Sequence, residues 1–107
     1  MKTTLLILSL LLSIGFAQSI KAEDTSEGEA LYKAKTCWSC HGKDAKSPLI
    51  PIYPKLAGQN ETYAFNQMKD IKSGKRANGQ SVAMKGVMGL VNEDEMKAIA
   101  KWLAAQK

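Results

Sequence analysis

A chain of 107 residues with a formal net charge of +5 is long enough for one small domain. Two cysteines exclude a disulfide-dense scaffold, and a single histidine excludes any site that needs two imidazole ligands. A hydrophobic share of 45% that includes 7% aromatic residues excludes a disordered chain.

The first 22 residues have the pattern of a secretory signal peptide. Lys2 supplies a basic start, Leu5–Phe16 is mostly apolar, and small residues follow at Ala17 and Ala22. An uncleaved membrane anchor is the alternative, but a spanning helix needs about 20 apolar residues, more than this stretch contains. We expect cleavage after Ala22, with Ala17 as the competing site. Residues 23–107 would then form a single domain in the periplasm, and the loss of two lysines would lower its charge from +5 to +3.

Three segments of the mature chain are predicted to be helices, and each begins after a residue that can cap a helix. The segments are Glu27–Lys35, Glu61–Ser73 and Glu93–Ala105. The first and third open with capping-box pairs, Ser26 with Glu29 and Asn92 with Glu95. For the second helix, Asn60 is a good N-cap and Gly74 is suited to the C-terminal end.

Apolar residues recur at helical spacing along these segments. The stripes consist of Ala64, Met68 and Ile71 on the second helix, and of Met96, Ile99, Ala100 and Leu103 on the third. The stretches 43–60 and 75–91 are predicted to be irregular, because they contain three prolines and three glycines respectively. No stretch alternates as a strand would, so the predicted fold is all-α.

The run C-W-S-C-H at residues 37–41 is the densest group of chemically reactive side chains. C-x-x-C-H is the attachment signature of c-type haem. Cys37 and Cys40 would lie on the same side of a helical turn, where each thiol can add to one haem vinyl group, and His41 would follow as an iron ligand. Because a chain of this size has a marginal core, a bound group would also complete it. The sequence therefore predicts one covalently attached haem c with its iron.

Three other interpretations of this motif are weaker. A disulfide between Cys37 and Cys40 would close a very small loop and stabilise the fold little. A thioredoxin-like redox motif requires a βαβ context, which the helical pattern lacks. A zinc site requires a fourth ligand, and the sequence contains no further cysteine or histidine.

A thioether is the sixth iron ligand that suits an electron carrier. Met68 and Met96 fall on predicted helix stripes and are expected in the core. Met84 and Met88 lie in the glycine-containing stretch, which could cross the haem face opposite His41. Spacing does not distinguish these two methionines, and both could be packing residues.

Short pieces elsewhere in the chain complete a family pattern. They are Gly28-x-x-x-Tyr32, the Cys37–Gly42 motif, Pro54–Gln59, Gln67–Ile71 with Gly74-Lys75-Arg76, and the acidic-capped last helix. On these pieces residues 26–107 resemble the class I c-type cytochromes of bacteria, both one domain of the di-haem cytochromes and their single-haem relatives. The resemblance implies the cytochrome c fold, with three main helices and two long loops wrapped around one covalent haem.

The resemblance also implies roles for individual residues. Met84 matches the axial methionine, seven residues before Val91, which leaves Met88 as a packing residue and the alternative ligand. The carbonyl of Pro51 is the best match for the acceptor of the second ring N–H of His41. Gly28 and Tyr32 match positions where the first helix crosses the last one at Trp102, and Gln59, Tyr63 and Arg76 match positions near the haem propionates.

These features predict a soluble one-electron carrier rather than an enzyme. Its apolar haem pocket is expected to be lined by Leu56, Phe65, Met68, Val82 and Leu103. Redox proteins are the expected donor and acceptor, such as an oxidase, a reductase or a dehydrogenase. Lysines that could steer an acidic partner are Lys43, Lys46, Lys55 and Lys85. No basic run indicates nucleic-acid binding, no stable membrane insertion is expected after cleavage, and we expect a monomer or weak association.

Two other functions use the same motif. The chain could be a haem subunit permanently bound to a periplasmic dehydrogenase or oxidase, in which case an apolar patch would surround the exposed haem edge. It could also be an enzyme or gas sensor with an open iron position, which would give a high-spin spectrum and rapid binding of carbon monoxide.

Overall fold

A computed structural model describes residues 24–107, so the predicted signal peptide and its cleavage site lie outside the described residues. This part of the chain contains helices and no strand, which confirms the all-α prediction. The helices are α1 (Ser26–Ala34), α2 (Trp38–His41), α3 (Glu61–Ser73), α4 (Ser81–Met88) and α5 (Glu93–Ala105). Between residues 24 and 107, no helix combines the length and the apolar character that a membrane-crossing helix needs.

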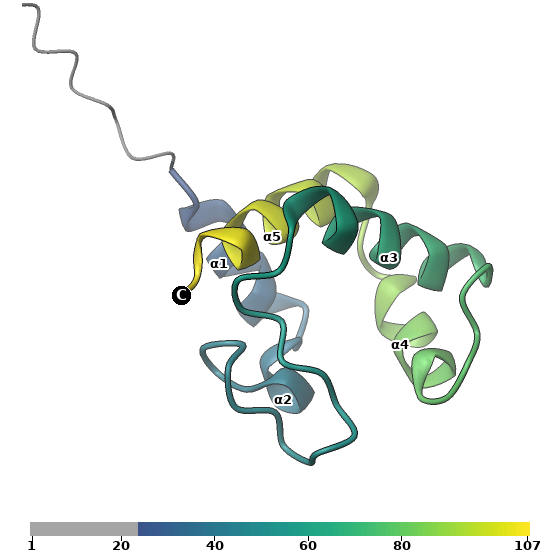
Figure 1. Cartoon of the computed structure of the whole chain (residues 1–107). Helices are drawn as coiled ribbons and strands as arrows, with labels where there is room; N and C mark the ends of the chain where they lie inside the picture. Colours follow the sequence, from purple (N-terminus) through teal and green to yellow (C-terminus); the bar gives the residue numbers. More distant parts are fainter. Residues whose placement is uncertain (1–23) are drawn as a thin grey trace, which may run out of the picture.

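Helix α5 organises the fold because it packs against both α1 and α3, while α4 packs against α3. Figure 1 shows that α2 with the following loop and α4 lie below this layer, on opposite sides. Segments far apart in the sequence, 37–57 and 81–88, therefore border the same face of the molecule.

The ends of α3 and α5 follow their predicted capping residues. The side chain of Asn60 accepts a hydrogen bond from the backbone N–H of Tyr63 at 2.9 Å, and Gly74 ends α3 in the left-handed conformation with φ of 83°. Asn92 and Glu95 form a complete capping box, with bonds of 2.8 and 3.0 Å. These predictions are confirmed.

The predicted capping box at the start of α1 is wrong. Thr25 is the N-cap of this helix and its side chain makes no capping bond. Instead, the backbone N–H of Ser26 donates to the carboxylate of Asp24 at 2.9 Å. The Asp24 carboxylate, two residues before Ser26, thus provides the acceptor in place of the predicted capping box of Ser26 and Glu29.

The segment 75–91 is not irregular throughout, because it contains helix α4. Met84 and Met88 are four residues apart and therefore lie on one face of this helix. Met88 is only 3% exposed, and Val91 just beyond the helix is 1% exposed. Packing of this face against α3 supports a helix whose intrinsic propensity is lowered by Gly86.

One end of the core lies where α1 crosses α5. Tyr32 is fully buried, its ring centroid is 4.8 Å from that of Trp102, and its hydroxyl donates to the carbonyl of Gly42 at 2.5 Å. The helices approach so closely at Gly28 that a Cβ there would lie 2.1 Å from the carbonyl oxygen of Ala98. The predicted crossing of Gly28 and Tyr32 on Trp102 is confirmed.

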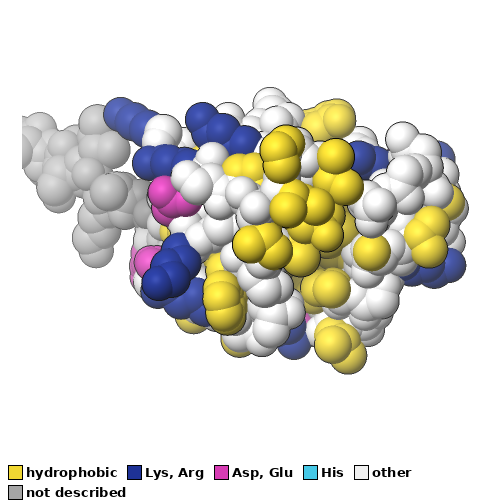
Figure 2. Space-filling view, turned by 90° about the horizontal axis from the view of Figure 1, so that it is seen from below, with side chains coloured by type: hydrophobic (Ala, Val, Ile, Leu, Met, Phe, Trp, Pro, Cys, Tyr) yellow, Lys and Arg dark blue, Asp and Glu magenta, His cyan; other side chains and the backbone are white. Residues whose placement is uncertain are grey.

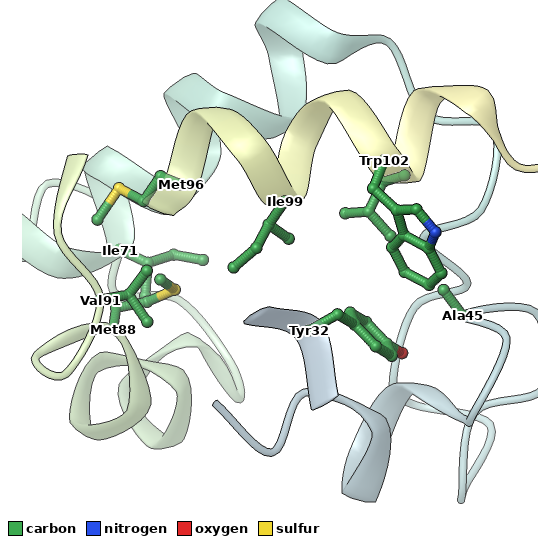
Figure 3. Close-up of a cluster of buried hydrophobic side chains, with 9 residues drawn as sticks. Tyr32, Ala45, Ile71, Met88, Val91, Met96, Ile99 and Trp102 are labelled. Atoms are coloured by element: carbon green, nitrogen blue, oxygen red, sulfur yellow. The ribbon is translucent and has the colours of Figure 1, made fainter. Parts of the chain in front are cut away.

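The other end of the core lies between α3, α4 and the beginning of α5. Figure 3 shows Ile71, Met88, Val91 and Met96 gathered there, with Ile99 between this group and the Tyr32–Trp102 pair. Half-buried apolar side chains pack against the two groups: Leu31, Cys37, Leu56, Ala57, Phe65, Met68 and Met84.

Candidate functional site

The cysteine motif forms one short helical turn directly after α1. Cys37 is the N-cap of α2, and its carbonyl accepts from the backbone N–H of His41 at 3.0 Å. Cys37 and Cys40 are free, half-buried thiols that stand three positions apart on this turn. The geometry places both sulfur atoms on one side, as attachment to a single planar group requires.

Thr36, the residue before the motif, has an unusual backbone conformation. Its φ of 62° lies in the left-handed region, which a β-branched residue rarely adopts. The hydroxyl of Ser39 donates to the carbonyl of Thr36 at 2.7 Å and supports this conformation. The strained residue turns the chain from α1 into α2, a feature that no sequence signal indicated.

His41 is oriented by a backbone carbonyl. The side chain is 5% exposed, and its Nδ1 lies 2.9 Å from the carbonyl oxygen of Pro54. Because a carbonyl only accepts hydrogen bonds, Nδ1 carries a proton. Nε2 makes no hydrogen bond to any residue between 24 and 107. Burial lowers the pKa of His41, although the hydrogen bond to Pro54 acts in the opposite direction. At neutral pH the ring is therefore uncharged, and Nε2 can donate its lone pair to a metal.

The prediction that Pro51 provides this acceptor is wrong. Pro51 is exposed in a turn, in which the backbone N–H of Tyr53 donates to the carbonyl of Ile50 at 3.1 Å. This turn directs Pro51 outward, and the chain returns to His41 three residues later, at Pro54. A proline carbonyl is the acceptor, as the family pattern implied, but it belongs to a different proline.

The burial of the Cys37 thiol argues against a redox-active cysteine pair. Burial raises the pKa of Cys37 to about 11, so the thiol is protonated at neutral pH. A thiol oxidoreductase needs a lowered pKa to form its thiolate nucleophile. The part of the chain that the structure describes also contains no cluster of three or more His, Cys, Asp or Glu side chains for a zinc ion.

The structure separates the two candidate methionines by their surroundings. Met84 is half-buried, packs at the edge of the core and lies near His41. Met88 is enclosed in the core, as are Met96 and, in part, Met68. The thioether of Met84 is thus the one that borders the face shared with His41.

The remaining predicted site residues are distributed around this face. Leu56 and Gln59 are half-buried, and Tyr63 is 52% exposed on α3. Arg76 is half-buried, and its Nη1 donates to the side-chain oxygen of Gln67 at 3.0 Å, which holds the guanidinium against α3. Among the expected pocket residues, Phe65 and Met68 are half-buried, Leu103 lies in the core, and Val82 is 64% exposed.

Apolar side chains gather on the face below α3 and α5. Figure 2 shows them over the middle of this face, seen from below relative to Figure 1. The large hydrophobic side chains that the structure leaves exposed are Trp38, Leu49, Ile50, Ile52, Tyr63, Val82 and Leu90. Many exposed apolar groups on one small domain indicate a bound group or partner. Two thiols, a neutral imidazole and a thioether beside an apolar face fit a covalently attached haem.

Comparison with known proteins agrees with this chemistry. Residues 25–107 match the model of the Cytochrome c family. The chain is 42% identical to cytochrome c4 of Pseudomonas aeruginosa, over 95% of this chain and 48% of the relative. It is 34% identical to cytochrome c-554(548) of Halomonas halodenitrificans, over 80% of this chain and 100% of that protein. It is also 31% identical to a thiosulfate dehydrogenase electron acceptor of Stutzerimonas stutzeri, over 92% of this chain and 44% of that one.

The chain spans about half the length of several relatives that it matches, including the three proteins named cytochrome c4 from Pseudomonas aeruginosa, Stutzerimonas stutzeri and Azotobacter vinelandii. It therefore resembles one domain of the di-haem cytochromes, as the sequence predicted. The family match extends over nearly all of the described residues. The chain belongs to the cytochrome c family, as a small class I c-type cytochrome that binds haem c covalently.

Proposed function

We propose that the chain is a one-electron carrier of the periplasm. Cys37 and Cys40 would hold the haem through two thioether bonds, and His41 and Met84 would be the axial ligands of its iron. The observation that carries this proposal is the neutral, buried imidazole of His41, whose Nδ1 is bonded to Pro54 and whose Nε2 is left for a metal.

The haem, when bound, supplies the one-electron Fe(III)/Fe(II) couple. The carbonyl of Pro54 keeps the His41 ring in one tautomer and one orientation, and it makes Nε2 a stronger electron donor. Since His41 is buried and directly follows Cys40, one of the two proposed attachment residues, its ring would be held in place in both oxidation states. A ligand that stays in place lowers the rearrangement that accompanies electron transfer.

Two observations support Met84 over Met88 as the second ligand. Met84 is half-buried at the edge of the core and lies near His41. Met88 is 3% exposed and packs with Val91 and Ile71, so its release toward the haem would empty part of the core. A thioether ligand favours the ferrous state and raises the reduction potential.

The ligand assignment is tested by spectroscopy of two single variants of the haem-loaded protein. Met84→Ala should abolish the thioether-to-iron charge-transfer band of the oxidised protein, and it should open the iron to carbon monoxide after reduction. Met88→Ala should keep the band and lose thermal stability, because it leaves a cavity in the core. The opposite pattern of bands would transfer the ligand role to Met88.

Redox proteins are the proposed partners, namely an oxidase, a reductase or a dehydrogenase as donor or acceptor. One relative carries the name of an electron acceptor of thiosulfate dehydrogenase, which supports a partner of this class. The exposed lysines that could steer an acidic partner are Lys43, Lys46, Lys55 and Lys85. Electron-transfer rates with an acidic redox partner should fall as ionic strength rises, and a rate independent of salt would contradict steering.

Export and cleavage after Ala22 complete the proposal. The basic, apolar and small-residue regions at residues 1–22 support a signal peptide, and residues 23–107 would be the mature cytochrome domain. N-terminal sequencing and the intact mass of the periplasmic protein test this assignment. A mass that includes residues 1–22 together with one haem would show that the leader is retained.

A further inference from the structure

Two lysines from different helices bind the turn that follows α4. The ammonium group of Lys35, at the end of α1, donates to the carbonyl of Leu90 at 2.9 Å. The ammonium group of Lys72, in the last turn of α3, donates to the carbonyl of Val91 at 2.6 Å. Consecutive carbonyls are thus held from two sides, and we call these two lysines with the two carbonyls the lysine clamp.

The clamp satisfies carbonyl groups that the local backbone does not. At the end of α4, the carbonyls of Lys85, Val87 and Met88 accept from the next backbone N–H groups, at 3.0 to 3.1 Å. The following carbonyls, those of Leu90 and Val91, accept from the lysines. Positive charge at this end also interacts favourably with the negative end of the α4 dipole.

Glu95 connects the clamp to α5. One carboxylate oxygen lies 3.3 Å from the ammonium of Lys35, and the other accepts from the backbone N–H of Asn92 at 3.0 Å. The hydrogen bond from Asn92 is the largest cause of the lowered pKa of Glu95, and the charges of Lys35 and Lys72 act in the same direction. The side chains of Lys35 and Glu95 are only 26% and 22% exposed, so the ion pair is partly protected from solvent.

The clamp holds the C-terminal end of α4, where the helix meets the core. Met88 and Val91 fill the core beneath the turn, as Figure 3 shows, with exposures of 3% and 1%. The other end of α4 begins at the buried Ser81 and follows residues 75–80, most of which are exposed. The helix packs mainly on α3. Met84 stands one turn before Met88 on the same face. The position of Met84 therefore depends in part on how firmly the clamped end of α4 stays in place.

We propose that Lys35 and Lys72 are positioning residues that hold α4, and with it Met84, at the haem. This inference rests on the proposed ligation by Met84. Lys35 stands two residues before Cys37, so the clamp joins the Cys37–His41 motif to the end of the helix that carries Met84. Without the lysine donors, the carbonyl of Leu90 and the partly buried carbonyl of Val91 lose their partners, and the end of α4 opens more often. Each opening would withdraw Met84 from the haem, so that an external ligand could bind the iron in its place.

The test uses Lys72 variants of the haem-loaded protein, because Lys35 is close to the attachment motif. Lys72→Met keeps an unbranched side chain of similar size and removes the donor, whereas Lys72→Arg keeps a charged donor. Lys69→Met is the matched control, since Lys69 is on the same helix and its ammonium lies 3.8 Å from Glu93 instead of the turn. Two rates are measured: the displacement of the methionine by imidazole in the ferric protein, and the hydrogen exchange of amides 81–88.

Lys72→Met should raise both rates about tenfold, the scale set by one lost hydrogen bond to a charged group. Lys72→Arg and Lys69→Met should leave both rates within about twofold of the wild type. Unchanged rates in Lys72→Met, with the charge-transfer band intact, would overturn the clamp. A wild-type protein without that band would instead contradict ligation by Met84, and the clamp would then have no role toward iron.

Discussion

Among the helices of residues 24–107, α1 and α4 each contain a glycine, Gly28 and Gly86, and the surroundings of these two glycines differ sharply. A Cβ on Gly28 in α1 would lie 2.1 Å from the carbonyl oxygen of Ala98 and 2.6 Å from the Cβ of Trp102, both in α5. A Cβ on Gly86 in α4 would meet no atom within 4 Å. Gly86 is two residues from Met84, so it points away from the face that carries the methionine. Gly28→Ala therefore tests the α1–α5 crossing, and Gly86→Ala is its matched control.

The two substitutions should have opposite signs. Alanine in an unobstructed helix is about 0.5–1 kcal/mol more favourable than glycine, which is the expected gain for Gly86→Ala. At Gly28 the carbon–oxygen distance of 2.1 Å must increase to about 3.3 Å, so α1 must move away from α5 by about 1 Å. Overpacking of this kind costs about 1–3 kcal/mol, and no side-chain rotation relieves a contact with a backbone oxygen. A net loss of about 2 kcal/mol corresponds to a decrease in Tm of about 8–16 °C for a domain of this size.

Thermal unfolding of the haem-loaded variants, followed by far-ultraviolet circular dichroism, measures both effects. The α1–α5 crossing would be less close than the structure shows if Gly28→Ala unfolded at the wild-type temperature or above it. A loss of stability in Gly86→Ala would contradict the open surroundings of that position. Only a lower Tm for Gly28→Ala combined with a higher Tm for Gly86→Ala agrees with the surroundings of both glycines.

Three further substitutions test the buried hydroxyl, the capping carboxylate and the attachment cysteines. Tyr32→Phe removes the donor to the Gly42 carbonyl and should destabilise the protein by about 1–3 kcal/mol in chemical denaturation, whereas an unchanged midpoint would show that this bond is replaced by water. Glu95→Gln should lower Tm at neutral pH. Because the folded pKa of Glu95 lies below 4.5, the advantage of the wild type is present above pH 4.5 and declines as the pH falls through the folded value. A difference in Tm between the wild type and Glu95→Gln that does not change with pH would show that the charge of the Glu95 carboxylate is not its cause. Replacing Cys37 and Cys40 together by serine should leave no covalent haem in the mass spectrum and a largely unfolded chain in circular dichroism, and a folded apoprotein would show that the haem is not needed to complete the core.

Local signals were sufficient for the two longest helices. The bounds of α3 and α5 agree with the prediction, because each helix follows an asparagine whose side chain accepts from the backbone N–H three residues later. Their apolar stripes face the core, with Ile71 and Ile99 among the buried residues. The interactions that define these helices join residues within about four positions of one another, so the sequence pattern alone predicts the helices.

Helix α4 was missed because its stability comes from contacts outside the segment. Three glycines between residues 75 and 91 lower the local helix propensity, and no capping side chain marks its start at Ser81. What supports the helix is burial of Met88 and Val91 against α3 and α5, together with the lysines that bind its end. Those partners are distant in sequence, so the pattern of residues 75–91 alone could not predict the helix.

The haem-binding motif at residues 37–41 was readable from the sequence because its chemistry depends on spacing along one helical turn. Side-chain identity and separation are sufficient to place two thiols and an imidazole beside one another. The hydrogen-bond acceptor of His41 could not be predicted in this way. We expected the carbonyl of Pro51, whereas the structure has the carbonyl of Pro54. Every residue has a backbone carbonyl, so residue type does not show which one meets a given donor. That choice, like the binding of the turn after α4 by Lys35 and Lys72, depends on the path of the folded chain.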